Sequence, residues 1–201
     1  MILFDLCGSE EHPAYQKLHV DNHVRHLDFI RSATEAALAV GRPFLSQTVI
    51  KALNFHAIAC LHTNAGQYRP CDVSNAAGTV YPPFWQVPDL MDDFTNRVNR
   101  HWDNAHPAEL GAHVLWKLNA IHPFINGNGR TARAACFFVI CLKAGGWLPY
   151  DPVLPVLIKE NNDEYIAALR YADGNNGDTS RLAALLARLL QQQVTEAAAK
   201  Q

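Results

Sequence analysis

The segment 129–143 constrains the fold of this 201-residue chain more than any other. From residue 134 it reads AACFFVICLK, so that apolar side chains would lie on every face of a helix and not on a single stripe. A helix of this kind is stable only when other elements cover all its sides. We therefore predict one all-α domain in which this helix is central and buried and ends before Gly145.

Helical signals also cover most of the rest of the chain. Pro13 and Gly41 fit the first turn and the end of one long helix, and Ser46 can cap the next. Apolar residues recurring every three or four positions extend this pattern. Helices are expected over about 13–40, 46–61, 88–102, 107–121, 162–172 and 179–198. The stretch DPVLP (151–155) is punctuated by prolines, and no helix is assigned to it.

One segment is β-like. In CDVSNAAGTVY (71–81), alternating residues flank the turn-forming sequence NAAG. This pattern predicts a small exposed β-hairpin on the helical domain.

Composition excludes several function classes. The net charge of -2 and the pI near 6.5 argue against a nucleic-acid partner. The longest apolar run has nine residues (134–142), far fewer than the roughly 20 needed to cross a bilayer, and the first residues do not resemble a signal peptide. Five cysteines without zinc-ligand spacing favour reduced thiols. We expect a cytoplasmic protein without a membrane partner.

The loop HPFINGNGRTAR (122–133) lies between two apolar helical segments. Its glycines permit backbone conformations that turn successive N–H groups toward one point, and the following helix adds the positive end of its dipole. Arg130 and Arg133 fall in the first helical turn, where cations are unfavourable unless an anion lies in front of them. The loop is therefore predicted to bind a polyphosphate.

His122 stands beside this predicted phosphate site. A neutral imidazole there can take a proton from an incoming hydroxyl, which suggests in-line attack on phosphorus. Phe124 is expected to fix the loop to the core. The alternative is an ordinary interhelical loop whose arginines pair with acidic neighbours and whose histidine caps a helix.

The loop closely resembles the signature of the Fic (Fido) family, HPF-x-(Asp/Glu)-G-N-G-R-x-x-R. Eight positions agree: His122, Pro123, Phe124, Gly127, Asn128, Gly129, Arg130 and Arg133. GQYRPCDVS (66–74) and YPP (81–83) are similar to the family's segment around its target-docking hairpin. The resemblance implies a Fic-type helical bundle with a central buried helix and a β-hairpin flap. It also implies a core domain over 46–192, an N-terminal helical extension over 1–45 and a frayed end over 193–201.

The family's usual activity is transfer of AMP from Mg-ATP to a Ser, Thr or Tyr hydroxyl of a target protein. The resemblance implies that His122 is the general base and that Arg130 and Arg133 hold the β- and γ-phosphates. Gly127, Asn128 and Gly129 would form the phosphate nest.

The same resemblance implies how target and nucleotide are placed. The hairpin at 71–83 would bind the target segment by backbone pairing. Gly129, where a kinase-like branch has lysine, favours nucleotidyl transfer. The adenine is expected near Tyr165, Leu169 and Tyr171.

The family's magnesium-binding acid is Asn126 in this sequence. An amide oxygen can still bind Mg²⁺ but brings no charge, so we predict weakened metal affinity without loss of the chemistry. Two alternatives remain open. One is a nucleotide-binding pseudoenzyme or regulator, and the other is transfer of another group such as UMP or phosphocholine.

Many family members carry an inhibitory helix with the pattern (Ser/Thr)-x-x-x-Glu-(Gly/Asn). The nearest stretch here is RSATEA (31–36), in which Glu35 would pair with Arg133. The alternatives are a glutamate on a solvated helix face and control by a separate antitoxin chain.

Three histidines, His19, His23 and His26, share one helix face at positions i, i+4 and i+7. This spacing suits metal ligands, but no fourth partner is evident, and a solvated polar face explains it equally well.

Overall fold

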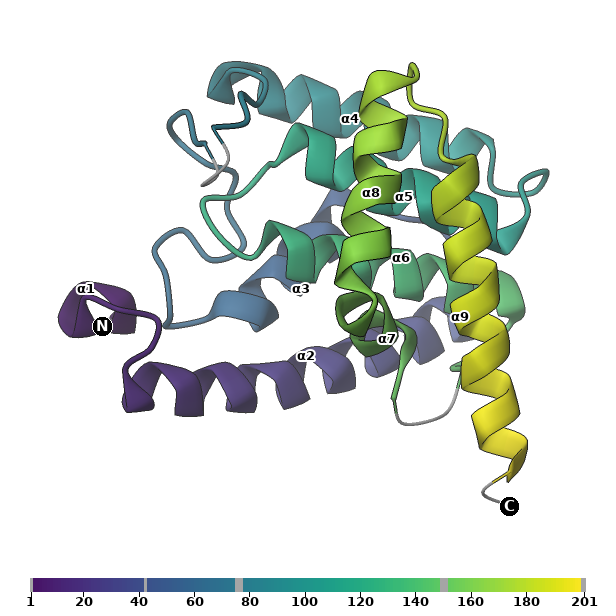
Figure 1. Ribbon diagram of the computed structural model, residues 1–201, viewed down its shortest axis with the longest axis horizontal. Helices are drawn as coiled ribbons and strands as arrows, with labels where there is room; N and C mark the ends of the chain where they lie inside the picture. The colour runs from purple at the N-terminus through teal and green to yellow at the C-terminus, as the bar shows by residue number, and fades with distance from the viewer. Residues whose placement is uncertain (1, 42, 75–77, 149–151, 200–201) are drawn as a thin grey trace.

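The computed structural model describes residues 2–41, 43–74, 78–148 and 152–199, and the side chains up to residue 195. The predicted all-α class is confirmed (Figure 1). The helices are α1 (Leu3–Cys7), α2 (Pro13–Val40), α3 (Gln47–Ile58), the short 3-10 helix η1 (Phe84–Gln86), α4 (Val87–Arg100), α5 (Pro107–Ile121), α6 (Asn128–Ala144), α7 (Leu154–Glu160), α8 (Asn162–Gly174) and α9 (Ser180–Ala199).

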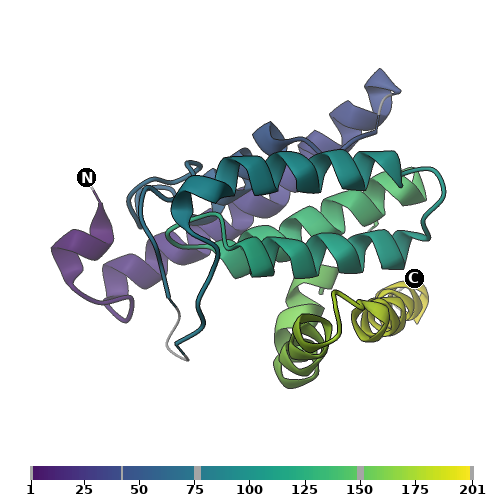
Figure 2. The same ribbon diagram turned by 90° about the horizontal axis from the view of Figure 1, so that it is seen from above.

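Helix α6 is the central helix, as its composition predicts. Every side chain from Ala134 to Leu142 is at most 4% exposed. Helices α2, α3, α5 and α7 pack against it, and Figure 2 shows α5 lying alongside it. At Gly111 of α5 an added Cβ would lie 2.8 Å from Ile140 Cδ1 of α6, so a larger residue there would force the Ile140 side chain to shift where these two helices approach each other.

The predicted helix ends are confirmed by their caps. Helix α2 ends at Gly41, which adopts a left-handed φ of 69°. The Ser46 hydroxyl accepts a hydrogen bond from the Val49 N–H at the start of α3. At the start of α5, His106 and Glu109 form a reciprocal capping box.

A short helix that the sequence analysis did not assign follows the proline-punctuated stretch. Residues 149–151 lie outside the described part of the chain, but α7 begins at Leu154 with Pro155 in its first turn. Proline is tolerated there because its missing N–H would have no partner within the helix. Pro155 therefore lies at the start of α7.

The predicted hairpin is not shown. The described residues on its two sides form a single isolated antiparallel bridge between Ser74 and Val80, and residues 75–77 of the turn lie outside the description. The Val80 side chain is 91% exposed, so no apolar surface covers this side of the bridge. A two-stranded ladder without such cover is only marginally stable.

The long helix α2 lies along α3 and α6 (Figure 1). Its inward face buries Tyr15, Asn22, His26, Ile30 and Thr34. Helices α8 and α9 pack on each other and on α5. The division into an extension, a core and a frayed end remains a prediction. None of the described helices has the length and hydropathy needed to cross a bilayer.

Candidate active site

The loop between α5 and α6 is shaped by two left-handed residues. His122 ends α5 with φ 52° and Gly127 precedes α6 with φ 78°. A Cβ at Gly127 would lie 2.7 Å from Ile58 Cγ2 and 3.0 Å from Asn54 Nδ2. Position 127 therefore needs glycine both for its backbone conformation and for space.

Asn128 fixes the loop from inside. Its Oδ1 accepts a hydrogen bond from the Phe124 N–H at 2.9 Å, and its Nδ2 donates to the Phe124 carbonyl at 2.8 Å. Its side chain is thus a structural clamp. The ring of Phe124 is 1% exposed, in agreement with its expected structural role.

The main chain at the start of α6 keeps donors available. Thr131 N–H bonds back to the Gly127 carbonyl, which makes it the first N–H of the regular α6 pattern. The N–H groups of residues 128–130 precede that pattern. Any contribution to a phosphate nest at Asn128 therefore comes from its backbone.

Asn54 of α3 joins three segments around this loop. Its Nδ2 donates to the Asn126 carbonyl at 2.9 Å and to Thr131 Oγ1 at 3.2 Å, and its Oδ1 accepts from the Gly66 N–H. The residue is fully buried.

Arg69 is a residue that the sequence analysis missed. It is 2% exposed, and its guanidinium donates to the carbonyls of His122 (2.8 Å), Cys71 (3.1 Å) and Pro82. Its own N–H donates to the Pro123 carbonyl. Arg69 thereby attaches both sides of segment 71–83 to the loop that carries His122. The available signal was an arginine within the family-like stretch GQYRP.

The His122 imidazole lies between the loop and this segment. Tyr81 stacks on it with ring centroids 3.9 Å apart. Burial lowers the pKa of His122 to about 4, against the opposing effect of the Asn119 carbonyl, which lies 3.4 Å from Nδ1. The imidazole is therefore neutral at pH 7. A proton on Nδ1, directed at that carbonyl, leaves the Nε2 lone pair free to accept another.

A polar chain leads from this histidine to Arg133. Asn119 Nδ2 donates to the Tyr165 hydroxyl at 2.9 Å. Tyr165 is 3% exposed. Burial raises the pKa of Tyr165 to about 12, and the nearby Arg133 guanidinium opposes that rise, so the hydroxyl and the second arginine of the motif are electrostatically coupled.

Arg130 is held by neutral groups. It donates to Asn126 Oδ1 (2.8 Å) and to the Ala57 carbonyl (3.2 Å), and one of its nitrogens lies 3.0 Å from His19 Nδ1. In the described part of the chain no carboxylate forms an ion pair with Arg130 or Arg133. Burial lowers the pKa of both guanidinium groups. Two half-buried cations without acidic partners favour a bound anion.

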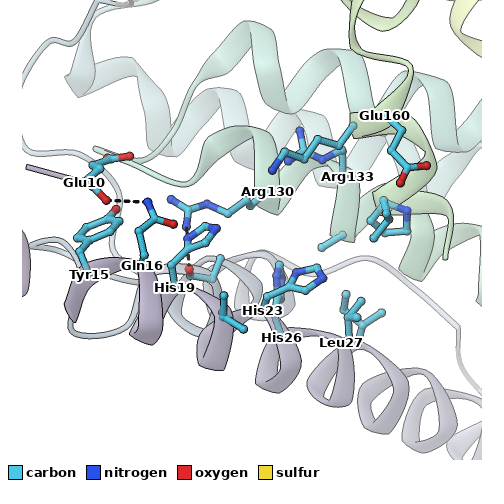
Figure 3. Close-up of a pocket in the computed structure, with 17 residues that line it drawn as sticks. Glu10, Tyr15, Gln16, His19, His23, His26, Leu27, Arg130, Arg133 and Glu160 are labelled. Carbon is cyan, nitrogen blue, oxygen red and sulfur yellow. Dashed lines mark hydrogen bonds between the residues drawn. The ribbon is translucent and has the colours of Figure 1, made fainter. Parts of the chain in front are cut away.

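Both arginines line a cavity of about 800 Å³ between α2, α6 and α7 (Figure 3). The three histidines of α2 face them across this cavity, with Lys159, Glu10 and Glu160 also in its wall. His26 is 5% exposed and its Nε2 has no hydrogen-bond partner. The cavity is mostly cationic or neutral in its polar lining, which suits a polyphosphate.

Glu35 does not reach this cavity. Its carboxylate pairs with Arg31 at 3.0 Å on an exposed face of α2. The expected pairing of Glu35 with Arg133 is therefore absent from this conformation, because residue 35 points to solvent. The geometry corresponds to the alternative of a solvated helix face.

The structure offers no metal site at the α2 histidines: among the described residues no group of three His, Cys, Asp or Glu side chains could hold a metal ion. The three residues expected near the adenine, Tyr165, Leu169 and Tyr171, do not line this cavity. Tyr165 is buried in the core, and Tyr171 bonds Asp178 and stacks on Arg181. The place of the adenine stays a prediction.

The five cysteines are free thiols, as predicted. Cys136 and Cys141 are buried in α6, where burial raises the pKa of both.

Comparison with known proteins agrees with the motif. The model of the Fic/DOC family matches residues 44–140. The chain is 32% identical over 138 residues to a protein adenylyltransferase Fic of Drosophila persimilis, which covers 67% of this chain and 25% of the relative. It is 39% identical over 83 residues to a Fido domain-containing protein of Dictyostelium discoideum, covering 40% of this chain and 53% of that protein.

The fold has solved counterparts. A Fic domain containing signaling protein from Bacteroides thetaiotaomicron superposes with a TM-score of 0.72 at 24% identity, over 88% of this chain and 69% of the other. Taken together, the helical fold and the loop define a Fic-type domain. The chain is a member of the Fic/DOC family through residues 44–140, and it spans about a quarter of the length of the Drosophila relative.

Proposed function

We propose that this domain transfers AMP from Mg-ATP to a Ser, Thr or Tyr hydroxyl of a target protein. The observation that carries the proposal is the pair Arg130 and Arg133, which lie in the wall of a large cavity and form no ion pair with a carboxylate among the described residues. His122, eight residues before Arg130 in the same motif, does not line this cavity, and burial lowers its pKa to about 4. The names of the Drosophila relatives, protein adenylyltransferase Fic, support the same activity.

In the proposed reaction, His122 Nε2 accepts the proton of the target hydroxyl as its oxygen attacks the α-phosphorus of ATP. A bond forms between that oxygen and the α-phosphorus, and the bond from the α-phosphorus to the bridging oxygen of the β-phosphate breaks. AMP remains on the target, and pyrophosphate leaves with the bridging oxygen. Arg130 and Arg133 stabilise the charge that develops on the β- and γ-phosphates.

The donor set at position 126 fits Mg²⁺ with a neutral ligand. The amide oxygen of Asn126 accepts a hydrogen bond from Arg130 at 2.8 Å, so it lies beside one of the two arginines proposed to hold the phosphates. Nucleotide phosphates commonly supply the charged ligands of protein-bound Mg²⁺. When bound, the ion would neutralise phosphate charge.

Segment 71–83 is the proposed docking site for the target. Arg69 fixes both of its sides to the His122 loop, while Val80 is almost fully exposed. An extended target segment that pairs with this backbone would complete a ladder, and would carry its hydroxyl toward the imidazole.

The test uses ATP labelled at the α-phosphate and a cell extract as the source of targets. We expect labelled AMP to be incorporated into protein, and His122→Ala to reduce the incorporation at least about 100-fold while ATP binding persists. Binding without incorporation would instead indicate a pseudoenzyme. Label from UTP or from a phosphocholine donor, and not from ATP, would identify another transferred group.

A further inference from the structure

Glu10 lies beside the position where this sequence lacks the family's acid. Glu10 Oε1 is 3.4 Å from Asn126 Nδ2, although the two residues are 116 positions apart in the chain. Glu10 also lines the cavity that contains Arg130. A carboxylate is therefore present at the mouth of the phosphate cavity, but it comes from the turn before α2.

The position of Glu10 is built by several contacts. Its Oε1 lies 3.1 Å from His62 Nε2, and that same nitrogen lies 2.7 Å from the Tyr15 hydroxyl. Gln16 Nε2 donates to the Glu10 main-chain carbonyl at 2.7 Å. The Glu10 side chain is still 49% exposed, and the residue lines the cavity.

The ligands that Mg²⁺ prefers explain why a carboxylate at this position matters. A protein-bound magnesium ion usually has one or two carboxylates, substrate phosphates and waters. Asn126 offers only a neutral oxygen. Figure 3 places Glu10 and Glu160 at opposite ends of the cavity. Glu10 lies at the end near Asn126, whose amide contacts both Glu10 and Arg130.

We propose that Glu10 supplies the carboxylate for the magnesium ion of Mg-ATP, in place of the acid that Asn126 has lost. The inference rests on the proposed nucleotide-binding function of the cavity. It states that the negative charge at the metal position has moved from the α5–α6 loop to the turn before α2, and that the long helix α2 thereby takes part in nucleotide binding.

The simpler role for Glu10 is structural, as the partner of His62. The two roles differ in what they predict for metal. A structural Glu10 stabilises the fold but leaves the coupling between Mg²⁺ and ATP unchanged. A metal-binding Glu10 sets that coupling, and a carboxylate placed at residue 126 can replace it.

The experiment measures the ATP dissociation constant by calorimetry, once with Mg²⁺ and once with EDTA. The ratio of the two constants is the metal coupling. Every protein compared carries His122→Ala, so that ATP is not consumed. Four proteins are compared in this background: the one without a further change, Glu10→Gln, Asn126→Asp, and the double variant Glu10→Gln/Asn126→Asp. The control is Glu160→Gln, which removes a charge from the far end of the same cavity.

We expect Glu10→Gln to reduce the metal coupling at least about 10-fold, the scale on which metal sites respond to altered partners. Asn126→Asp should raise the coupling, the double variant should return near the starting value, and Glu160→Gln should change little. Equal coupling in Glu10→Gln and the unchanged protein would overturn the inference. An equal effect of Glu160→Gln would also overturn it, because a general charge effect would then suffice.

The controls separate this inference from the proposed function. If the unchanged protein binds no ATP in either buffer, the proposed function fails. If it binds ATP with a coupling that Glu10 does not affect, only the present inference fails. Should Glu10→Gln not fold, Glu10→Asp withdraws the carboxylate by one methylene group and is expected to lower the coupling in the same direction.

Discussion

At the residue scale, the conformation of the loop between α5 and α6 depends on the contacts of two residues, Gly127 and Asn128. Asn128 carries two hydrogen bonds to one residue, Phe124, and Gly127 fits between Asn54 and Ile58 with no room for a side chain. The motif residues thus divide into those that build the loop and those that face the cavity. Gly127 and Asn128 belong to the first group, and Arg130 and Arg133 to the second.

Gly127→Ala tests the steric part of this division. A Cβ there meets Ile58 at 2.7 Å and is attached to a left-handed backbone. We expect the free energy of unfolding to fall by roughly 2–4 kcal/mol, as for overpacking combined with backbone strain. Urea denaturation measures the change. Gly145→Ala is the matched control, because Gly145 also has a left-handed backbone (φ 77°) but no atom lies within 4 Å of the added carbon there. A comparable loss in both variants would contradict the steric explanation.

At the element scale, α2 and segment 71–83 surround the loop from two sides. Helix α2 presents histidines and a tyrosine to the cavity, while its opposite face is charged and exposed. Segment 71–83 is attached through one arginine. Substitutions in α2 and in the attachment of segment 71–83 can therefore be tested separately.

Glu35 lies on the exposed face of α2, paired with Arg31. Because it does not contact Arg133, we expect Glu35→Ala to leave AMP incorporation within about twofold of the starting rate. This follows from the small contribution of an exposed ion pair. Labelled-ATP assays of self-modification measure it, and a strong activation on removing Glu35 would revive the inhibitory pairing.

Arg69→Lys tests the attachment of segment 71–83. Lysine keeps the charge but cannot reproduce the fork that reaches the carbonyls of His122, Cys71 and Pro82. We expect faster amide hydrogen exchange in residues 71–74 and 78–81. The exposed Arg31→Lys is the control. Unchanged exchange in the segment would mean that other contacts hold it.

At the scale of the whole molecule, several histidines are buried in the neutral form. Burial lowers the pKa of His26 to about 3 and the pKa values of His113 and His122 to about 4. In the unfolded chain these groups take up protons near their ordinary pKa of about 6.5. Between those values the unfolded state binds more protons, so acid favours unfolding.

The unfolding free energy should therefore be largest at neutral pH and fall as the pH drops from about 6.5 to 4. Each such histidine contributes at most about 1.4 kcal/mol per pH unit. Urea denaturation at a series of pH values measures the slope. His26→Gln, which cannot titrate, should have a shallower slope; a curve parallel to that of the unchanged protein would contradict this cause.

The sequence by itself determined the longer helices and the identity of the loop, but not the short helices α1 and α7. Helical periodicity, Pro13, Gly41 and Ser46 are local signals, and the composition of α6 alone required it to be central. His122 and the two arginines were recognised because a motif is contiguous along the chain. Such features depend on neighbouring residues, so they can be predicted without coordinates.

Only the tertiary structure decided which distant side chains join the site. Arg69, Tyr165 and Glu10 come from separate elements, and their contacts with the loop depend on how helices pack. Packing likewise turned Glu35 to solvent and the α2 histidines toward the cavity. The physical reason is that the face a helix turns toward its neighbour depends on the apolar area that many residues bury together. A short stretch of sequence does not contain those residues.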